Sequence, residues 1–134
     1  MRLQSLLGAL LCVCVASCGG GGPCTVIGLN VTPKNSTANH SAASPGNAIQ
    51  FFATTVVPSG CVNTANASDA QSLPRVTWSV SDPVNVSISN TLDGTAGTAT
   101  CLNATAGAIT VTASFPPSPT QSKQVAGTAK LTCN

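Results

Sequence analysis

The stretch Arg75-Val76-Thr77-Trp78-Ser79-Val80 alternates apolar and polar residues, and this alternation decides the fold class. Successive side chains of a β-strand point to opposite faces, so a period of two predicts a strand that is buried on one face. Val76, Trp78 and Val80 are therefore expected to face the core, with Trp78 at its centre. The residues that follow, Ser81-Asp82-Pro83, favour a turn.

Similar patterns lie on both sides of this stretch. The other strands are expected at about residues 25–32, 48–56, 84–88, 97–102, 108–115 and 127–133. Further inward-facing positions on them are Phe51, Ile109, Val111 and Leu131. The chain has no Glu and is rich in Thr, Val, Ser, Gly and Pro, a composition that disfavours helices. Seven short strands predict an all-β sandwich of two antiparallel sheets.

The first residues have the parts of an export signal. Arg2 gives a positively charged start, residues 6–16 form an apolar run, and the small residues Ala16 and Ser17 precede a possible cleavage point. As a helix, the apolar run would reach only roughly half of a ~30 Å hydrocarbon core. Residues 1–17 are therefore expected to form a cleaved signal helix, not a permanent transmembrane span.

The four residues Val15-Ala16-Ser17-Cys18 resemble the lipobox of bacterial lipoproteins. The resemblance implies cleavage just before Cys18 and attachment of a diacylglycerol to its thiol, which would tie the protein to a membrane. Two acyl chains hold a protein far longer than one. Gly19 after the cysteine implies the outer membrane of the bacterial cell envelope. The alternative is an ordinary secreted protein, because small residues also precede its cleavage site.

The remaining chain divides into a tether and one domain. Residues 18–23 contain the expected lipidated cysteine and a Gly-rich tether, and residues 24–134 are long enough for a single domain. Only 6% of the residues are charged, against about 25% in typical soluble domains. No cluster of cations is present for binding a phosphate backbone, so nucleic acid is not an expected partner.

The motif Val76-Thr77-Trp78-Ser79-Val80-Ser81-Asp82-Pro83 also resembles bacterial Ig-like domains of the group 2 kind. The similarity continues in four other segments, namely 27–33, 50–54, 107–113 and 127–132. It therefore covers nearly all of residues 24–134. The resemblance implies a seven-stranded Ig-like β-sandwich, although the cysteine pair and the tyrosine corner of antibody domains are both missing.

Four cysteines remain after Cys18, namely Cys24, Cys61, Cys101 and Cys133. An even number in an exported protein favours disulfides, and the spacing is not that of a zinc site. In an Ig-like sandwich, the first two would lie at one end and the last two at the other. The resemblance thus implies the pairs Cys24–Cys61 and Cys101–Cys133, which is one of three possible connectivities.

The residues that could carry out chemistry are few. The chain has one His and three Asp, so no enzyme activity, metal or cofactor is expected. His40 lies in a polar segment and is interpreted as an exposed imidazole without a role. Asp82 and Asp93 each lie in a predicted turn, whereas a calcium site usually gathers several carboxylates.

Two segments offer contact surfaces. Phe52 alternates with the inward Phe51 and could face outward, and residues 57–74 form a long loop of the kind that often carries recognition. We therefore expect a lipid-anchored module at the cell envelope with a structural, adhesive or protein-interaction role and no catalysis. The alternative is a small carbohydrate-binding module that uses Phe52, so the partner could be an envelope protein or a glycan.

Overall fold

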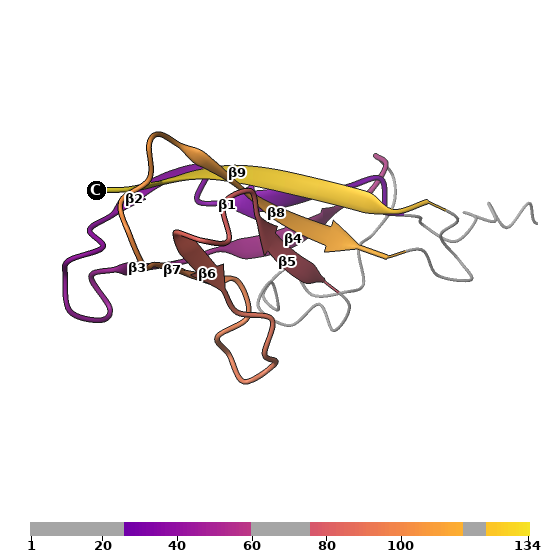
Figure 1. Ribbon diagram of the computed structural model, residues 1–134. Coiled ribbons are helices and arrows are strands. Elements are labelled where there is room, and N and C mark those ends of the chain that lie inside the picture. The colour runs from indigo at the N-terminus through magenta and orange to yellow at the C-terminus, as the bar shows by residue number, and fades with distance from the viewer. Residues whose placement is uncertain (1–25, 60–75, 117–122) are drawn as a thin grey trace, which may run out of the picture.

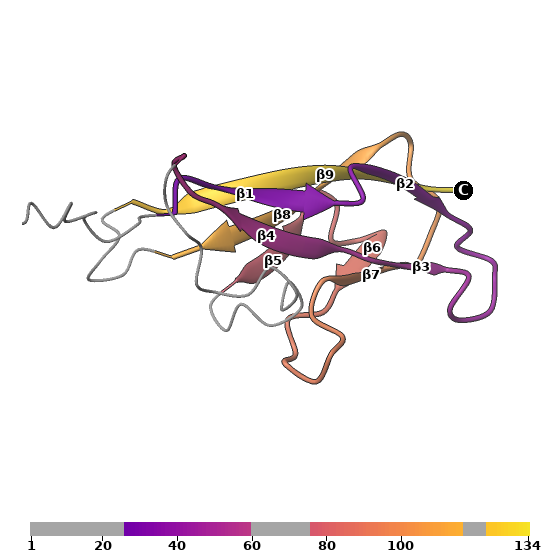
Figure 2. The same cartoon turned by 180° about the vertical axis from the view of Figure 1, so that it is seen from behind.

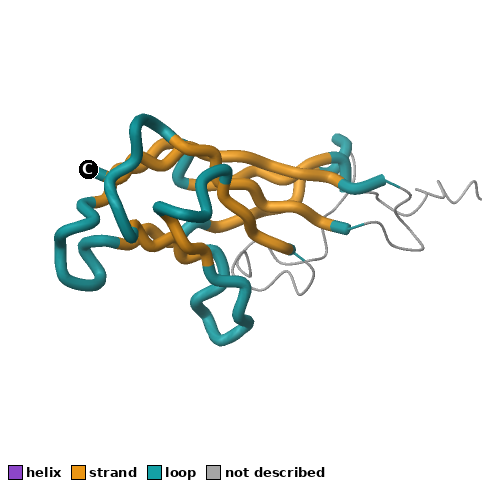
Figure 3. The backbone as a smooth tube through the Cα atoms, in the orientation of Figure 1, coloured by secondary structure: helices purple, strands orange, loops and turns teal. Residues whose placement is uncertain are grey.

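The described residues, 26–59, 76–116 and 123–134 of a computed structural model, fold into strands joined by loops and contain no helix (Figure 3). The all-β prediction is therefore confirmed for this part of the chain. Its nine strands are β1 (Gly28–Thr32), β2 (Asn35–Ala38), β3 (Ala48–Gln50), β4 (Phe52–Val56), β5 (Thr77–Val80), β6 (Val86–Ile88), β7 (Thr98–Cys101), β8 (Ile109–Phe115) and β9 (Val125–Cys133).

The nine strands form three hydrogen-bonded sheets, with the orders β2-β9-β8-β5, β3-β7-β6 and β1-β4. Every pairing is antiparallel except that between β2 and β9, which is parallel. In Figure 1, β8 and β9 lie in front of β1 and β4, and in Figure 2 they lie behind them. The core lies between these two groups of strands.

The strand predicted at 48–56 is divided at Phe51 because the chain changes its pairing partner there. Before Phe51, β3 pairs with β7, and after it, β4 pairs with β1. The N–H of Phe51 donates to the carbonyl of Gly97 at 2.9 Å, and the Phe51 ring is fully buried. The two short strands thus lie on either side of the buried Phe51.

Strand β2 is absent from the prediction of seven strands in two antiparallel sheets. With β2 and the division at Phe51, the described residues form nine strands in three sheets, and the pairing of β2 with β9 is parallel. Pro33 follows β1 and has no N–H to continue a ladder. The chain then forms β2 beside β9, where Asn35 pairs with Lys130 and Ala38 with Cys133. Only Ala38 of its four residues is buried, so no apolar alternation marked this strand.

Trp78 lies in the core and is only 5% exposed. Gly97 makes room for it, because a Cβ at Gly97 would lie 2.9 Å from the indole ring, and the φ of +83° there favours glycine. Val76 and Val80 are partly buried and pack against the edge of the core. The other core positions expected from the alternation, which are Phe51, Ile109, Val111 and Leu131, are also buried.

The backbones of β1 and β9 approach each other closely at Gly127. A Cβ at this position would lie 2.2 Å from the carbonyl oxygen of Leu29. No side chain fits at such a distance. The glycine therefore allows a strand of the two-stranded sheet to pack directly on the longest strand of the four-stranded sheet.

Candidate functional site

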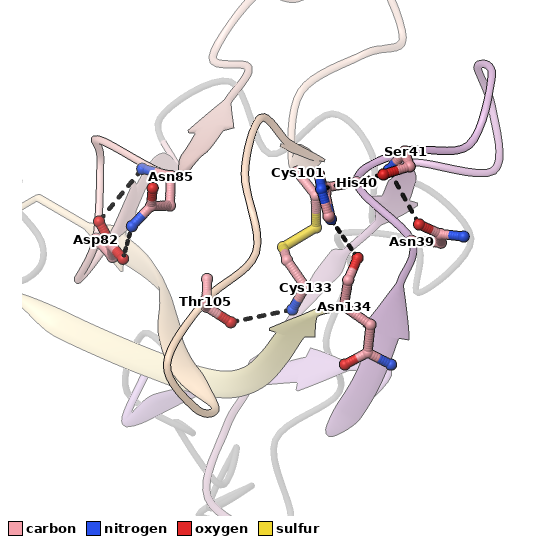
Figure 4. The surroundings of a disulfide bond; sticks show 9 residues. All are labelled: Asn39, His40, Ser41, Asp82, Asn85, Cys101, Thr105, Cys133 and Asn134. Atoms are coloured by element: carbon pink, nitrogen blue, oxygen red, sulfur yellow. Dashed lines mark hydrogen bonds between the residues drawn. A yellow bond between two sulfur atoms is a disulfide. The ribbon is translucent and has the colours of Figure 1, made fainter.

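A disulfide joins Cys101 at the end of β7 to Cys133 at the end of β9, as predicted (Figure 4). The two Cα atoms are 5.7 Å apart, within the usual range for a disulfide. Both cysteines are 1% exposed, and their strands belong to different sheets, so the bond staples the two sheets together. Cys18, Cys24 and Cys61 lie outside the described residues.

Three loops gather around the disulfide, and we call this region the disulfide end. They are residues 39–47, 81–85 and 102–108. Main-chain hydrogen bonds connect them to the strand ends: Cys101 N donates to Asn47 O at 2.9 Å, Leu102 N to Asn85 O at 2.8 Å, and Thr105 N to Cys133 O at 2.9 Å. Each loop is therefore fixed by its neighbours.

His40 lies at the disulfide end and makes two side-chain hydrogen bonds (Figure 4). Its Nδ1 contacts the main-chain oxygen of Asn134, and its Nε2 lies 3.0 Å from the Oγ of Ser41. The side chain is half-buried. The expectation of an exposed imidazole is wrong, because the end of β9 passes beside the loop that carries His40.

The backbone around His40 is held from both sides. His40 N donates to Asn134 O at 3.0 Å, and Asn134 N donates to Ala38 O at 3.0 Å, which continues the parallel pairing of β2 with β9. On the other side, the side chain of Asn39 accepts the N–H of Ser41 at 2.9 Å. The imidazole and the hydroxyl therefore project from a fixed backbone.

Asp82 and Asp93 both close turns, as expected. The carboxylate of Asp82 accepts the side-chain N–H of Asn85 at 2.8 Å. Asp93 accepts the hydroxyl of Thr95 at 2.6 Å and its main-chain N–H at 2.9 Å. These bonds stabilise the ionised form, so the hydroxyl of Thr95 and then its N–H lower the pKa of Asp93 below its ordinary value.

Among the described residues, no group of three or more His, Cys, Asp or Glu side chains could hold a metal ion. Phe52 is half-buried opposite Thr32, so it presents only part of its ring to solvent. Most of the loop predicted over 57–74 lies outside the described ranges.

Two members of the cluster around His40, Ser41 and Asn134, were absent from the sequence prediction. Ser41 adjoins His40 in the chain, and this adjacency was the available signal for it. Asn134 is 94 residues from His40 in the chain. Only the parallel pairing of β2 with β9 brings the two together, and that pairing has no local sequence pattern.

Within the ranges that the structure describes, no helix is long and apolar enough to cross a membrane. No protein-family model matches the chain, and no curated protein is similar to it in sequence.

Proposed function

We propose that this protein is a lipid-anchored Ig-like module of the bacterial cell envelope with a structural, adhesive or protein-interaction role. The observation that carries the proposal is Val15-Ala16-Ser17-Cys18, which comes after a charged start and an apolar run and before four glycines. A thiol at Cys18 is what thioether formation with a diglyceride requires. The two acyl chains would hold the protein at a membrane, with the outer membrane as the proposed site.

The strand order supports the Ig-like part of the proposal. In the constant type of Ig domain, one sheet has the order A-B-E-D and the other has C-F-G. If β3 and β4 count as one strand B, the described strands give β1-β4/β3-β7-β6 and β5-β8-β9, which match these two orders. Strand β2 is then an additional strand at the edge of the second sheet.

The direction of the strands supports a role in which the disulfide end faces a partner. The pairing of Gly28 with Val56 and of Thr32 with Phe52 places the start of β1 beside the end of β4. Strands β1 and β2 both run from there toward the disulfide end, where β9 also ends (Figures 1 and 2). A chain tethered through Cys18 would enter at the opposite end and hold the disulfide end away from the membrane.

The charge balance of the sequence supports an uncharged partner, such as a neighbouring envelope protein or a glycan. The residues after the leader contain three aspartates and four cations, Lys34, Arg75, Lys123 and Lys130, so their formal net charge is four minus three, or +1. Long-range steering by charge would be weak for such a surface. Short-range contact through hydroxyl and amide groups suits a module that is already held beside its partner by an anchor.

Metabolic labelling with an alkyne analogue of palmitate tests the anchor. The full chain is expressed with its leader in a bacterium, as wild type, Cys18→Ser and the matched control Cys14→Ser. Wild type and Cys14→Ser should take up the probe equally and sediment with membranes, and Cys18→Ser should take up none. Equal labelling of Cys18→Ser, or no labelling of any variant, would show that Cys18 carries no lipid.

A further inference from the structure

We propose that Ser41 is a nucleophilic site that accepts an acyl group from an ester or thioester, with His40 as its general base. This inference goes beyond the anchoring role and does not depend on it. It concerns a single covalent modification, not repeated turnover. The observation behind it is the chain of contacts from Ser41 Oγ through the imidazole of His40 to the oxygen of Asn134.

The contacts fix the tautomer of the imidazole. The main-chain oxygen of Asn134 can only accept a hydrogen bond, so Nδ1 of His40 must carry the proton of that bond. In a neutral imidazole, Nε2 is then left with its lone pair. In that form the hydroxyl of Ser41, 3.0 Å away, can donate to the lone pair. This is the arrangement in which an imidazole can take the serine proton.

A nucleophile, a base within hydrogen-bond reach and a third group that orients the base together mark an activated serine. Here the third group is the oxygen of Asn134, which follows the disulfide-bonded Cys133 and is held to the backbone of β2. The orienting oxygen therefore lies directly after a strand that the disulfide holds in place. Ser41 is exposed while His40 is half-buried, so a donor can reach the hydroxyl.

The proposed step conserves atoms and charge. Ser41 Oγ forms a bond to the carbonyl carbon of the donor, and its proton moves to Nε2 of His40. The bond between that carbon and the alkoxide or thiolate of the donor breaks, and the leaving group takes the proton from His40. The products are an ester on Ser41 and a free alcohol or thiol.

The surroundings of Ser41 limit the rate of the proposed acyl transfer. The N–H groups of Ser41 and Ala42 both donate to Asn39, to its side-chain oxygen and its carbonyl respectively, so neither is free to stabilise an oxyanion. Loss of one such donor typically costs about 10²- to 10³-fold in rate. We therefore expect reaction with activated donors and slow transfer from ordinary esters.

A biotin-linked fluorophosphonate tests the pair without requiring the natural donor. The serine oxygen bonds to phosphorus, fluoride leaves, and His40 takes the proton. The full-length protein is compared with Ser41→Ala, with His40→Gln and with Ser87→Ala, which removes an exposed serine of β6. Labelling is followed by intact mass and located by peptide mapping, and the Cys101–Cys133 peptide confirms that each variant retains its disulfide.

Wild type and Ser87→Ala should be labelled at Ser41 at the same rate, and Ser41→Ala should not be labelled there. His40→Gln should react about 10²-fold more slowly, the lower range for loss of a general base. Wild type unfolded in urea should also be labelled at Ser41 about 10²-fold more slowly than folded wild type. This comparison keeps the test valid if His40→Gln folds poorly. Absence of labelling at Ser41 in folded wild type, or labelling at equal rates with and without His40, would overturn the proposal.

Discussion

The side-chain amide of Asn90 holds the backbone of Trp78 at the edge of β5. Trp78 N donates to Asn90 Oδ1 at 2.6 Å, and Asn90 Nδ2 donates to Trp78 O at 3.0 Å. Strand β5 ends the four-stranded sheet, and among the described strands only β8 pairs with it. The side chain of Asn90 thus pairs with the main-chain N–H and C=O of Trp78, the two groups with which a further strand would pair. With these groups occupied, strands of other molecules are disfavoured at this edge.

Replacing Asn90 with Ala should destabilise the protein by about 1–2 kcal/mol, since two hydrogen bonds are lost and water can replace part of them. Urea unfolding of the two proteins measures the difference. Asn103→Ala is the matched control, because the side chain of Asn103 is also exposed but makes none of the hydrogen bonds seen among the described residues. Equal losses of stability in both variants would mean that the two hydrogen bonds between Asn90 and Trp78 do not stabilise the protein.

Replacing Gly127 with Ala should lower stability more than Asn90→Ala does, because the new methyl group would collide with the carbonyl of Leu29 in the facing strand. Forcing apart a packed contact typically costs about 1–3 kcal/mol. At Gly107, a Cβ would meet nothing within 4 Å, so Gly107→Ala is the control and should leave stability unchanged or slightly raised. Thermal unfolding of both variants checks this, and an unchanged midpoint for Gly127→Ala would contradict the close approach of β1 and β9.

Replacing both Cys101 and Cys133 with Ala should lower the free energy of unfolding by about 3–4 kcal/mol in the chain-entropy treatment, given their separation of 32 residues. The expected result is a lower urea midpoint than that of the oxidised wild type. Wild type treated with a reductant while unfolded provides the control that retains both thiols. Coincident unfolding curves for oxidised and reduced wild type would mean that the staple does not stabilise the folded state.

The sequence predicted the strands whose apolar residues alternate over several positions. Ile109, Val111 and Ala113 lie inward on β8 because each step of the alternation reverses the face of the sheet. Trp78 was predicted to lie in the core for the same reason. The Cys101–Cys133 pair followed from an expected arrangement of strand ends, and the structure has it.

The features that the sequence did not predict depend on contacts between segments far apart in the chain. Strand β2 is polar and exists because β9 offers it a free edge. The division at Phe51 reflects a change of partner, which alternation alone does not reveal. His40 was given no role because Asn134 reaches it only after β2 and β9 have paired. Such features are determined by tertiary pairing, which local patterns do not encode.

Acid should selectively weaken the turn that Asp93 closes. The folded-state pKa of Asp93 lies below its ordinary value of about 3.8, so the ionised form is favoured by folding. That stabilisation is fully present above the ordinary pKa and is lost as the pH falls through the lowered one. The difference in unfolding midpoint between wild type and Asp93→Asn should therefore be largest near neutral pH and should shrink below about pH 4.

An NMR titration of the Asp93 carboxyl group provides the direct measurement. Because the hydroxyl of Thr95 is the largest cause of the lowered pKa, Thr95→Val should move the pKa of Asp93 back toward its ordinary value. The main-chain N–H of Thr95 remains in that variant, so part of the lowering should persist. A titration that is identical in wild type and Thr95→Val would show that the hydrogen bond from the Thr95 hydroxyl, at 2.6 Å, does not lower the pKa of Asp93.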